Sequence, residues 1–230
     1  TLPNEISNII DEVKKTIPAE KLGIHAHNDT ENGVANALAA VNSGVRHVQG
    51  TINGLGERCG NTNLVSLIPT LVLKTNFYTN IQEKNLKSLT KISNTLSELL
   101  NEPKLKTAPY VGEYAFSHKG GLHASAVAKD PSTYEHIDPE LVGNSRNVII
   151  SDQAGKANLI SQLKKLEINI DSEKIYEILD LIKQKEAEGF SYDTALASFE
   201  LLVRRYSGEI KEYFNLNKFR VTDERRWNAK

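Results

Sequence analysis

The sequence predicts an α/β fold in its first third and a mostly helical arrangement in the rest. Helical and strand-like segments alternate from residue 3 to about residue 73, in the order α-β-α-β-α. This order implies parallel strands joined by crossover helices. In the last third, apolar residues recur at helical spacing. A chain of 230 residues can hold one or two domains.

An amphipathic helix is expected over residues 3–16, because apolar side chains recur there every three or four positions. A short buried strand is predicted next, at Leu22–His27, followed by an alanine-rich helix over about 31–43. Gly44 ends that helix. Three polar residues before it offer N-caps: Asn28, Asp29 and Thr30.

A second strand is expected at Val45–Thr51, followed by a glycine-rich loop over 53–60 and an apolar helix over about 62–73. In parallel α/β folds the active groups gather at the carboxyl ends of the strands. Five polar residues fall at those ends in this chain: His25, His27, Thr51, Asn53 and Asn61.

The remainder is expected to be mostly helical. Apolar spacing predicts a helix over 86–100, closed by Pro103, and a linker over 101–111, whereas residues 112–158 show little periodicity. Three amphipathic helices and a closing strand follow, at Leu159–Leu166, Ile175–Ile182, Leu196–Tyr206 and Phe219–Asp223. We expect three segments: 1–78, 79–158 and 159–230.

The composition excludes several classes of protein. Basic and acidic residues balance, 28 against 29, and no basic stripe indicates nucleic-acid binding. No stretch approaches the roughly 20 apolar residues that cross a membrane. A single cysteine, Cys59, excludes an internal disulfide and fits a cytoplasmic location. Because the chain starts at Thr1 and contains no Met, we expect a processed piece of a longer protein or a sequence without its modified methionines.

The HAHND run at residues 25–29 is the strongest chemical signal. Residues two apart in a strand project from one face, so His25 and His27 present two imidazoles, half of a metal site. Asn61 can add an amide oxygen from the next strand–loop unit. A single histidine beside an apolar strand is more often structural, and Asn61 alternatively caps the helix that begins near residue 62.

Four stretches together resemble the isopropylmalate synthase and homocitrate synthase family, most closely its citramalate synthase branch. They are HAHND (25–29), VQGTINGLGERCGN (48–61), HKGGLHASAVAKDPSTYEHIDPELVG (118–143) and ASFELLVRR (197–205). The resemblance implies that 1–78 holds the last two βα units of a (β/α)8 TIM barrel, followed by mostly helical subdomains. The family's first strand carries an Arg–Asp pair for the oxo acid and the metal, and no such pair precedes residue 25.

The activity that the resemblance implies is a metal-dependent Claisen condensation. Acetyl-CoA adds to the carbonyl of a 2-oxo acid, and the thioester is then hydrolysed. Pyruvate, the favoured oxo acid, gives citramalate, and 2-oxoisovalerate gives isopropylmalate. His25, His27 and Asn61 would hold the metal, and Mg²⁺, Mn²⁺ and Zn²⁺ all suit such ligands. The metal would polarise the oxo-acid carbonyl as a Lewis acid.

Within the same resemblance, His123 matches the catalytic histidine and Tyr134 matches a tyrosine beside the same centre. A histidine pKa near neutrality suits deprotonation of the acetyl methyl group or handling of the developing alkoxide. The segment crosses to the partner subunit's barrel in the family, so a homodimer is implied. Without the resemblance, His118, His123 and His136 are loop histidines.

Gly54, Gly56 and Gly60 correspond to an acetyl-CoA loop in the family, whereas their spacing by itself favours a tight βα turn. Thr51 is placed to bind the oxo-acid carboxylate, and a β-branched strand residue is the alternative.

Three residues near these motifs receive other interpretations. Glu57 and Arg58 can form an ion pair that shapes the loop. Related aldol lyases use a cysteine in a glycine-rich loop of different sequence, so Cys59 is not expected to take part in the reaction. Glu31 stands where relatives commonly have Gly, which puts the local loop shape in question.

Two other functions stay open beside the acyltransferase of isoleucine or leucine synthesis. A metal-dependent aldol lyase of the same superfamily would release acetyl-CoA or acetoacetate from a hydroxyacyl-CoA. A non-catalytic fragment would act in assembly, and this chain by itself is expected to be inactive.

Overall fold

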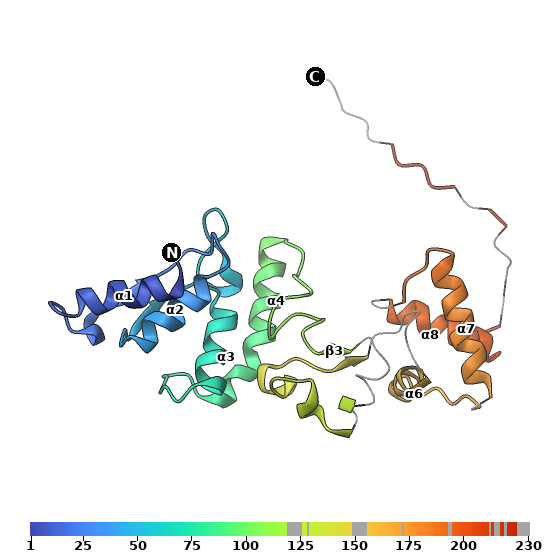
Figure 1. Cartoon of the computed structure of the whole chain (residues 1–230). Coiled ribbons are helices and arrows are strands. Elements are labelled where there is room, and N and C mark those ends of the chain that lie inside the picture. Colours follow the sequence, from blue (N-terminus) through green and yellow to red (C-terminus); the bar gives the residue numbers. More distant parts are fainter. Residues whose placement is uncertain are drawn as a thin grey trace, which may run out of the picture. The chain divides into compact units, whose positions relative to one another are not determined.

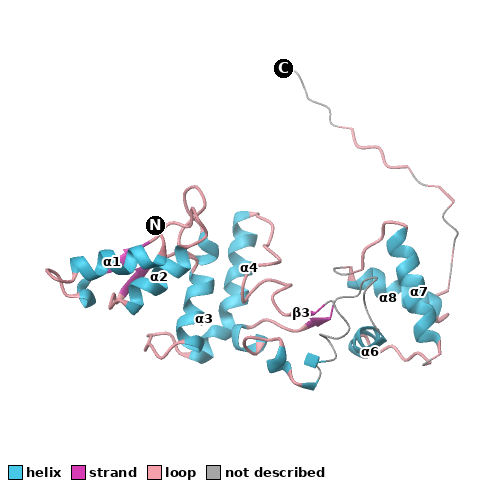
Figure 2. Cartoon of the chain, viewed as in Figure 1, coloured by secondary structure: helices cyan, strands magenta, loops and turns pink. Residues whose placement is uncertain are grey.

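The computed structural model divides the chain into two compact units, Thr1–Val148 and Ile149–Lys230 (Figure 1). Helices dominate both units, and the strands are few and short among the described residues (Figure 2). The structure describes residues 1–118, 126–127, 129–148, 156–171, 173–192, 195–211, 213, 217–218 and 220–224. No helix within these residues has the length and apolar character needed to cross a membrane.

The first half of unit 1 follows the predicted α-β-α-β-α order. Its elements are α1 (Pro3–Val13), β1 (Gly23–His25), α2 (Gly33–Asn42), β2 (His47–Gln49) and α3 (Leu64–Lys74), with short 3-10 turns at Ala19–Lys21 and Ile52–Gly54. The two strands pair in parallel, with Gly23 opposite His47. The α/β class and the crossover helix are therefore confirmed.

Both strands are shorter than predicted because the loop after β2 folds back across their ends. His27 forms an isolated antiparallel bridge with Asn61, and Thr51 forms an isolated parallel bridge with Asn63. The backbone groups beyond His25 thus find partners in the loop instead of in the neighbouring strand.

A small core lies beside β1, whose Ile24 packs against it. The predicted apolar face of α1 packs on α2 (Figure 1). The buried members of this core are Ile10 of α1, Ala40 of α2 and Val45, which precedes β2. Gly44 follows α2 with a φ of +111°, a left-handed conformation that suits glycine and ends the helix as predicted.

The second half of unit 1 contains η3 (Glu83–Ser88), α4 (Leu89–Leu100), β3 (Ser117–His118), η4 (Pro131–Thr133), η5 (Pro139–Val142) and β4 (Asn147–Val148). The helix expected over 86–100 is confirmed from Leu89 onward. It ends at Asn101, which adopts φ +54°, before Pro103 is reached. The parallel β3–β4 pair lies in the stretch where the sequence shows little periodicity.

One core joins α3 to the residues that follow it. Its buried members come from both halves of the unit: Val65, Leu86, Leu89, Tyr110, Val111, Phe116 and Val142. Segment 79–148 therefore packs directly on the last helix of the α-β-α-β-α region. The boundaries 1–78, 79–158 and 159–230 stay a prediction.

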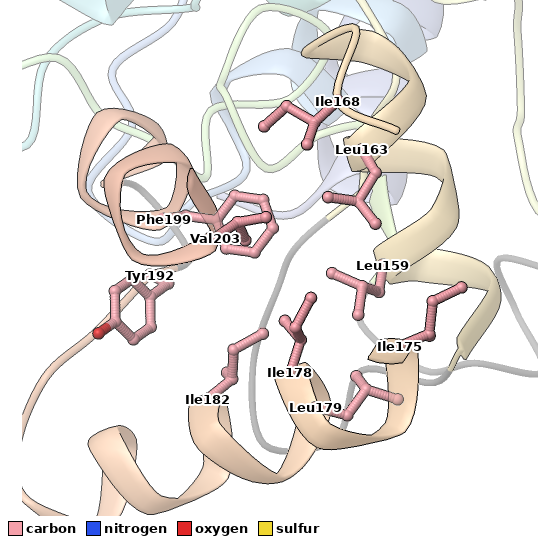
Figure 3. Close-up of a cluster of buried hydrophobic side chains, with 10 residues drawn as sticks. All are labelled: Leu159, Leu163, Ile168, Ile175, Ile178, Leu179, Ile182, Tyr192, Phe199 and Val203. Atoms are coloured by element: carbon pink, nitrogen blue, oxygen red, sulfur yellow. The ribbon is translucent and has the colours of Figure 1, made fainter. Parts of the chain in front are cut away.

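Unit 2 is built from the three predicted helices, α6 (Lys156–Lys165), α7 (Lys174–Ala187) and α8 (Leu196–Tyr206). Figure 3 shows Phe199 and Val203 of α8 beside Leu159 of α6 and Ile178 of α7, and all four are fully buried. The strand predicted at 219–223 is wrong for residues 220–223, which hold no regular structure. Val221 is 83% exposed there, so no apolar surface is buried that would favour pairing.

Shortening Ile178 to Val is expected to lower the free energy of unfolding by about 0.5–1.5 kcal/mol, because the lost methylene leaves a gap in the α6–α7–α8 core. Urea unfolding followed by circular dichroism measures this change. Leu201→Val removes one carbon at an exposed position of α8 and is expected to stay within about 0.5 kcal/mol of the original chain. Equal losses would contradict the packing described.

Candidate functional site

His25 and His27 meet at the carboxyl end of β1. The two ring centroids are 5.3 Å apart and the rings are inclined by 66°. His25 is the last residue of the strand, whereas His27 lies beyond it in the bridge to Asn61. Both line a cavity of about 270 Å³. The structure therefore brings the two predicted imidazoles together.

Asn61 is held beside His27 with its amide oriented. Its Nδ2 donates to the carbonyl of Leu55 at 3.1 Å, and its backbone N–H donates to the carbonyl of Gly54 at 3.0 Å. A Cβ at Gly56 would lie 2.5 Å from Asn61 Nδ2, so the glycine makes room for this amide. Of the two amide atoms, Oδ1 is the one left for another partner.

Two buried atoms of this site lack a hydrogen-bond partner: His27 Nδ1 and Asn61 Oδ1. A buried polar group without a partner costs about 1–3 kcal/mol, and such groups are rare in native structures. A divalent cation beside them would satisfy lone pairs of both kinds, since imidazole nitrogen and amide oxygen are ordinary metal ligands. The residues present thus fit a metal ion. Within the described part of the chain, no group of three His, Cys, Asp or Glu side chains gathers around a point that could hold one.

The loop that carries Asn61 is tied to the HAHND segment by charge and by backbone bonds. Arg58 Nε lies 3.3 and 3.2 Å from the two carboxylate oxygens of Asp29, and its Nη2 lies 3.1 Å from Oδ2. The predicted pair with Glu57 also forms, at 3.4 Å. Asn28 donates its N–H to Gly60 O at 2.9 Å. The two motifs therefore form one folded unit.

Two residues of these loops that are not glycine adopt left-handed backbone conformations. Glu31 has φ +57° and Arg58 has φ +59°. Glycine adopts this conformation without the penalty of a Cβ, so Gly at residue 31 would relieve that cost.

Thr51 uses its hydroxyl inside the loop, where Oγ1 donates to the carbonyl of Leu55 at 2.5 Å. Substrate binding by Thr51 stays a prediction. The alternative that Asn61 caps the next helix is wrong, because α3 begins at Leu64 and the Oδ1 of Asn63 accepts from Val65 N at 3.0 Å. Asn61 lies two residues before this cap, and its side chain donates to the carbonyl of Leu55 instead.

Changing Asn63 to Ala is expected to lower the free energy of unfolding by about 1 kcal/mol, because the cap of α3 loses its acceptor. Asn63→Asp keeps an acceptor in the same place and should retain most of the stability. Thermal unfolding of the two variants side by side measures the difference. A larger loss in Asn63→Asp than in Asn63→Ala would contradict this role.

Of the predicted catalytic pair, His123 lies outside the described residues. Tyr134 follows η4, is 51% exposed, and its ring lies 6.3 Å from that of His118. His136 stacks on Phe116 with centroids 5.4 Å apart. Burial and the nearby Lys74 lower the pKa of His136, which favours a neutral ring in this contact.

The sequence interpretation missed a buried charge next to Tyr134. The side chain of Glu135 is only 2% exposed and lies between Arg146 and His118. The glutamate does stand between Tyr134 and His136 in the motif, but no spacing rule connects it with an arginine 11 residues later.

Comparisons with known proteins match two successive parts of this chain to two related families. Residues 1–96 match the family described as HMGL-like, and residues 110–189 match the family described as homocitrate synthase post-HMGL domain-like. The (R)-citramalate synthase of Aquifex aeolicus is 51% identical over 96% of this chain, and that of Geobacter sulfurreducens is 47% identical over 98%.

This chain is a homologue of the citramalate synthases. It spans 42% and 43% of the length of those two relatives. A 2-isopropylmalate synthase of Haemophilus influenzae is 31% identical over 86% of this chain and 40% of its own length. A solved HMG-CoA lyase of Acinetobacter baumannii, in complex with coenzyme A and 3-methylmalate, aligns over 45% of this chain and 35% of its own, with 29% identity and a TM-score of 0.40.

Proposed function

We propose that the protein is an acyltransferase that condenses acetyl-CoA with pyruvate to form citramalate, in branched-chain amino-acid synthesis. The sequence similarity to citramalate synthases extends over almost the whole chain and supports this reaction class. The observation that carries the proposal within the structure is the pair of unpartnered buried atoms, His27 Nδ1 and Asn61 Oδ1, beside His25.

His25, His27 and Asn61 would hold a divalent metal, Mg²⁺, Mn²⁺ or Zn²⁺, whose chemistry is to polarise the carbonyl of the 2-oxo acid. The chain's own contribution is geometric. The Leu55 carbonyl fixes the amide of Asn61, and the Asp29–Arg58 pair fixes the loop that carries it. The ligand atoms are therefore oriented before the metal binds, which lowers the cost of binding.

The remaining roles concern the proton and the acyl group. His123 would take a proton from the acetyl methyl group, and Tyr134, with half of its surface exposed, would donate to the developing alkoxide or orient water. Thr51 would contact the oxo-acid carboxylate. Gly54, Gly56 and Gly60 would bring the loop backbone close to acetyl-CoA, and the left-handed φ of Gly54 and Gly60 supports a tightly folded loop there.

Three further proposals concern organisation. Residues 1–78 would form the last two βα units of a TIM barrel, and 79–158 and 159–230 would form helical subdomains. The protein would be a homodimer in which the segment with His123 and Tyr134 reaches the partner subunit's barrel. A cytoplasmic location fits the single exposed Cys59.

The test is an assay of coenzyme A thiol release by the full-length protein that carries this sequence, with acetyl-CoA and one 2-oxo acid at a time. Pyruvate-dependent release that EDTA abolishes and Mg²⁺ or Mn²⁺ restores supports the proposal. Faster release with 2-oxoisovalerate would mean the isopropylmalate reaction instead. Cleavage of a hydroxyacyl-CoA without condensation would mean an aldol lyase and would overturn it.

A further inference from the structure

Glu135 carries a buried charge that the proposed reaction does not use. Its side chain is 2% exposed, whereas the neighbouring carboxylates Asp138 and Glu113 are 52% and 43% exposed. A charge is rarely buried without a paired partner, because its desolvation is costly. The position of this carboxylate therefore needs an explanation.

The two neighbours of Glu135 lie at the small sheet of unit 1, one in β3 and one directly before β4. Arg146 directly precedes β4, and its Nε lies 2.9 Å from each carboxylate oxygen of Glu135. His118 ends β3, and its Nε2 lies 3.5 Å from Oε1, within ion-pair range but long for a hydrogen bond. Hydrogen bonding to Glu135 raises the pKa of Arg146, so the guanidinium stays protonated in this contact. One carboxylate thus binds Arg146, next to β4, and lies beside His118 of β3, whose buried Nε2 makes no hydrogen bond.

His136, the residue that follows Glu135, is also held in place. Lys74 of α3 donates to the backbone carbonyl of His136, whose ring lies against Phe116 and Tyr110. Tyr134, on the opposite flank of Glu135, faces the ring of His118. Tyr134, which is 51% exposed, therefore precedes two residues that are held by Arg146 and by Lys74.

From this arrangement we infer that Glu135 is the positioning residue for Tyr134. The carboxylate is bonded to Arg146 and lies 3.5 Å from His118 Nε2, and His118 in turn lies against the Tyr134 ring, with centroids 6.3 Å apart. His118 also directly precedes the stretch 119–125, which contains His123. The expected fall in kcat rests on the proposed function. The expected change in the surroundings of Tyr134 can be measured without any reaction.

The kinetic test uses the full-length protein. Glu135→Gln keeps the shape and removes the charge, and kcat is expected to fall roughly 10- to 100-fold, the range seen when groups that orient a reactive residue are lost. The KM values for acetyl-CoA and pyruvate should change little. Glu135→Asp should recover part of kcat. Glu83→Gln, at an exposed glutamate of η3, is the matched control.

A double-mutant cycle separates positioning from a general loss of structure. If Glu135 acts through Tyr134, Glu135→Gln in the Tyr134→Phe background should cause only a small further loss of kcat. A full, additive loss in that background would overturn the inference, as would an unchanged kcat in Glu135→Gln alone.

The structural test is the ¹³Cζ NMR signal of Tyr134, identified by its absence in Tyr134→Phe. It is expected to shift in Glu135→Gln and to stay in place in Glu83→Gln. A signal that does not move would overturn the inference even in a protein that releases no coenzyme A. If the original protein releases no coenzyme A, that result would count against the proposed function but not against the positioning role of Glu135.

Discussion

Replacing His27 by Ala is expected to lower kcat/KM of the full-length protein on the order of a thousandfold. A bound metal supplies several kcal/mol of transition-state stabilisation, and each 1.36 kcal/mol corresponds to a factor of ten in rate. The variant should also lose the metal dependence of its thermal unfolding, because a ligand that binds only the folded state raises the unfolding midpoint. Thiol release and unfolding scans with Mn²⁺ and with EDTA measure the two effects.

The effect of His27→Ala should depend on bound metal. His27 Nδ1 makes no hydrogen bond in the described structure, so in the metal-free protein the substitution removes no polar contact of that atom. His47→Ala, at an exposed histidine at the start of β2, is the matched control and should keep the metal response. A His27→Ala protein that binds Mn²⁺ as tightly as the original would refute the metal site.

Replacing Gly60 by Ala is expected to destabilise the protein by more than the about 1–3 kcal/mol that a left-handed conformation costs other residues. Gly60 has φ +84°, and an added Cβ would lie 1.9 Å from the carbonyl oxygen of Gly54. That oxygen accepts the N–H of Asn61, so a movement that relieves the collision also displaces the candidate metal ligand. Urea unfolding and Mn²⁺ affinity are both expected to fall.

Gly54 offers a matched comparison within the same loop. Its φ is +70°, but an added Cβ would lie 3.4 Å from its nearest neighbours, an ordinary contact. Gly54→Ala should therefore show the cost of the backbone conformation without the collision. Equal losses of unfolding free energy in the two variants would contradict the close approach of Gly60 to Gly54.

The helices were largely predictable because their signals are local. Apolar spacing and a terminal glycine placed α1, α2, α6 and α8 to within three residues of their observed bounds, whereas α7 extends five residues beyond its predicted end at Ile182. The strand ends were not predictable. Where β1 stops depends on the bridge between His27 and Asn61, two residues that only the folded loop brings together.

The short β3–β4 pair and the predicted C-terminal strand fail for related reasons. Ser117 pairs with Asn147 across 30 residues, and two-residue strands carry no alternating pattern. Alternation at 219–223, conversely, was not sufficient for a strand, because pairing needs a partner that sequence spacing does not supply. The capping of α3 by Asn63 was missed because two asparagines two positions apart gave the same local signal.

The sequence by itself determined that two imidazoles stand near one strand end, because His25 and His27 are only two residues apart, and that an asparagine follows in the loop after the second predicted strand. Only the tertiary structure decided which atoms of that group stay without partners, how Asp29 holds Arg58, and where Glu135 is buried. Each of these depends on contacts between residues 11 to 34 positions apart, and such contacts form when segments pack, which residue periodicity does not encode.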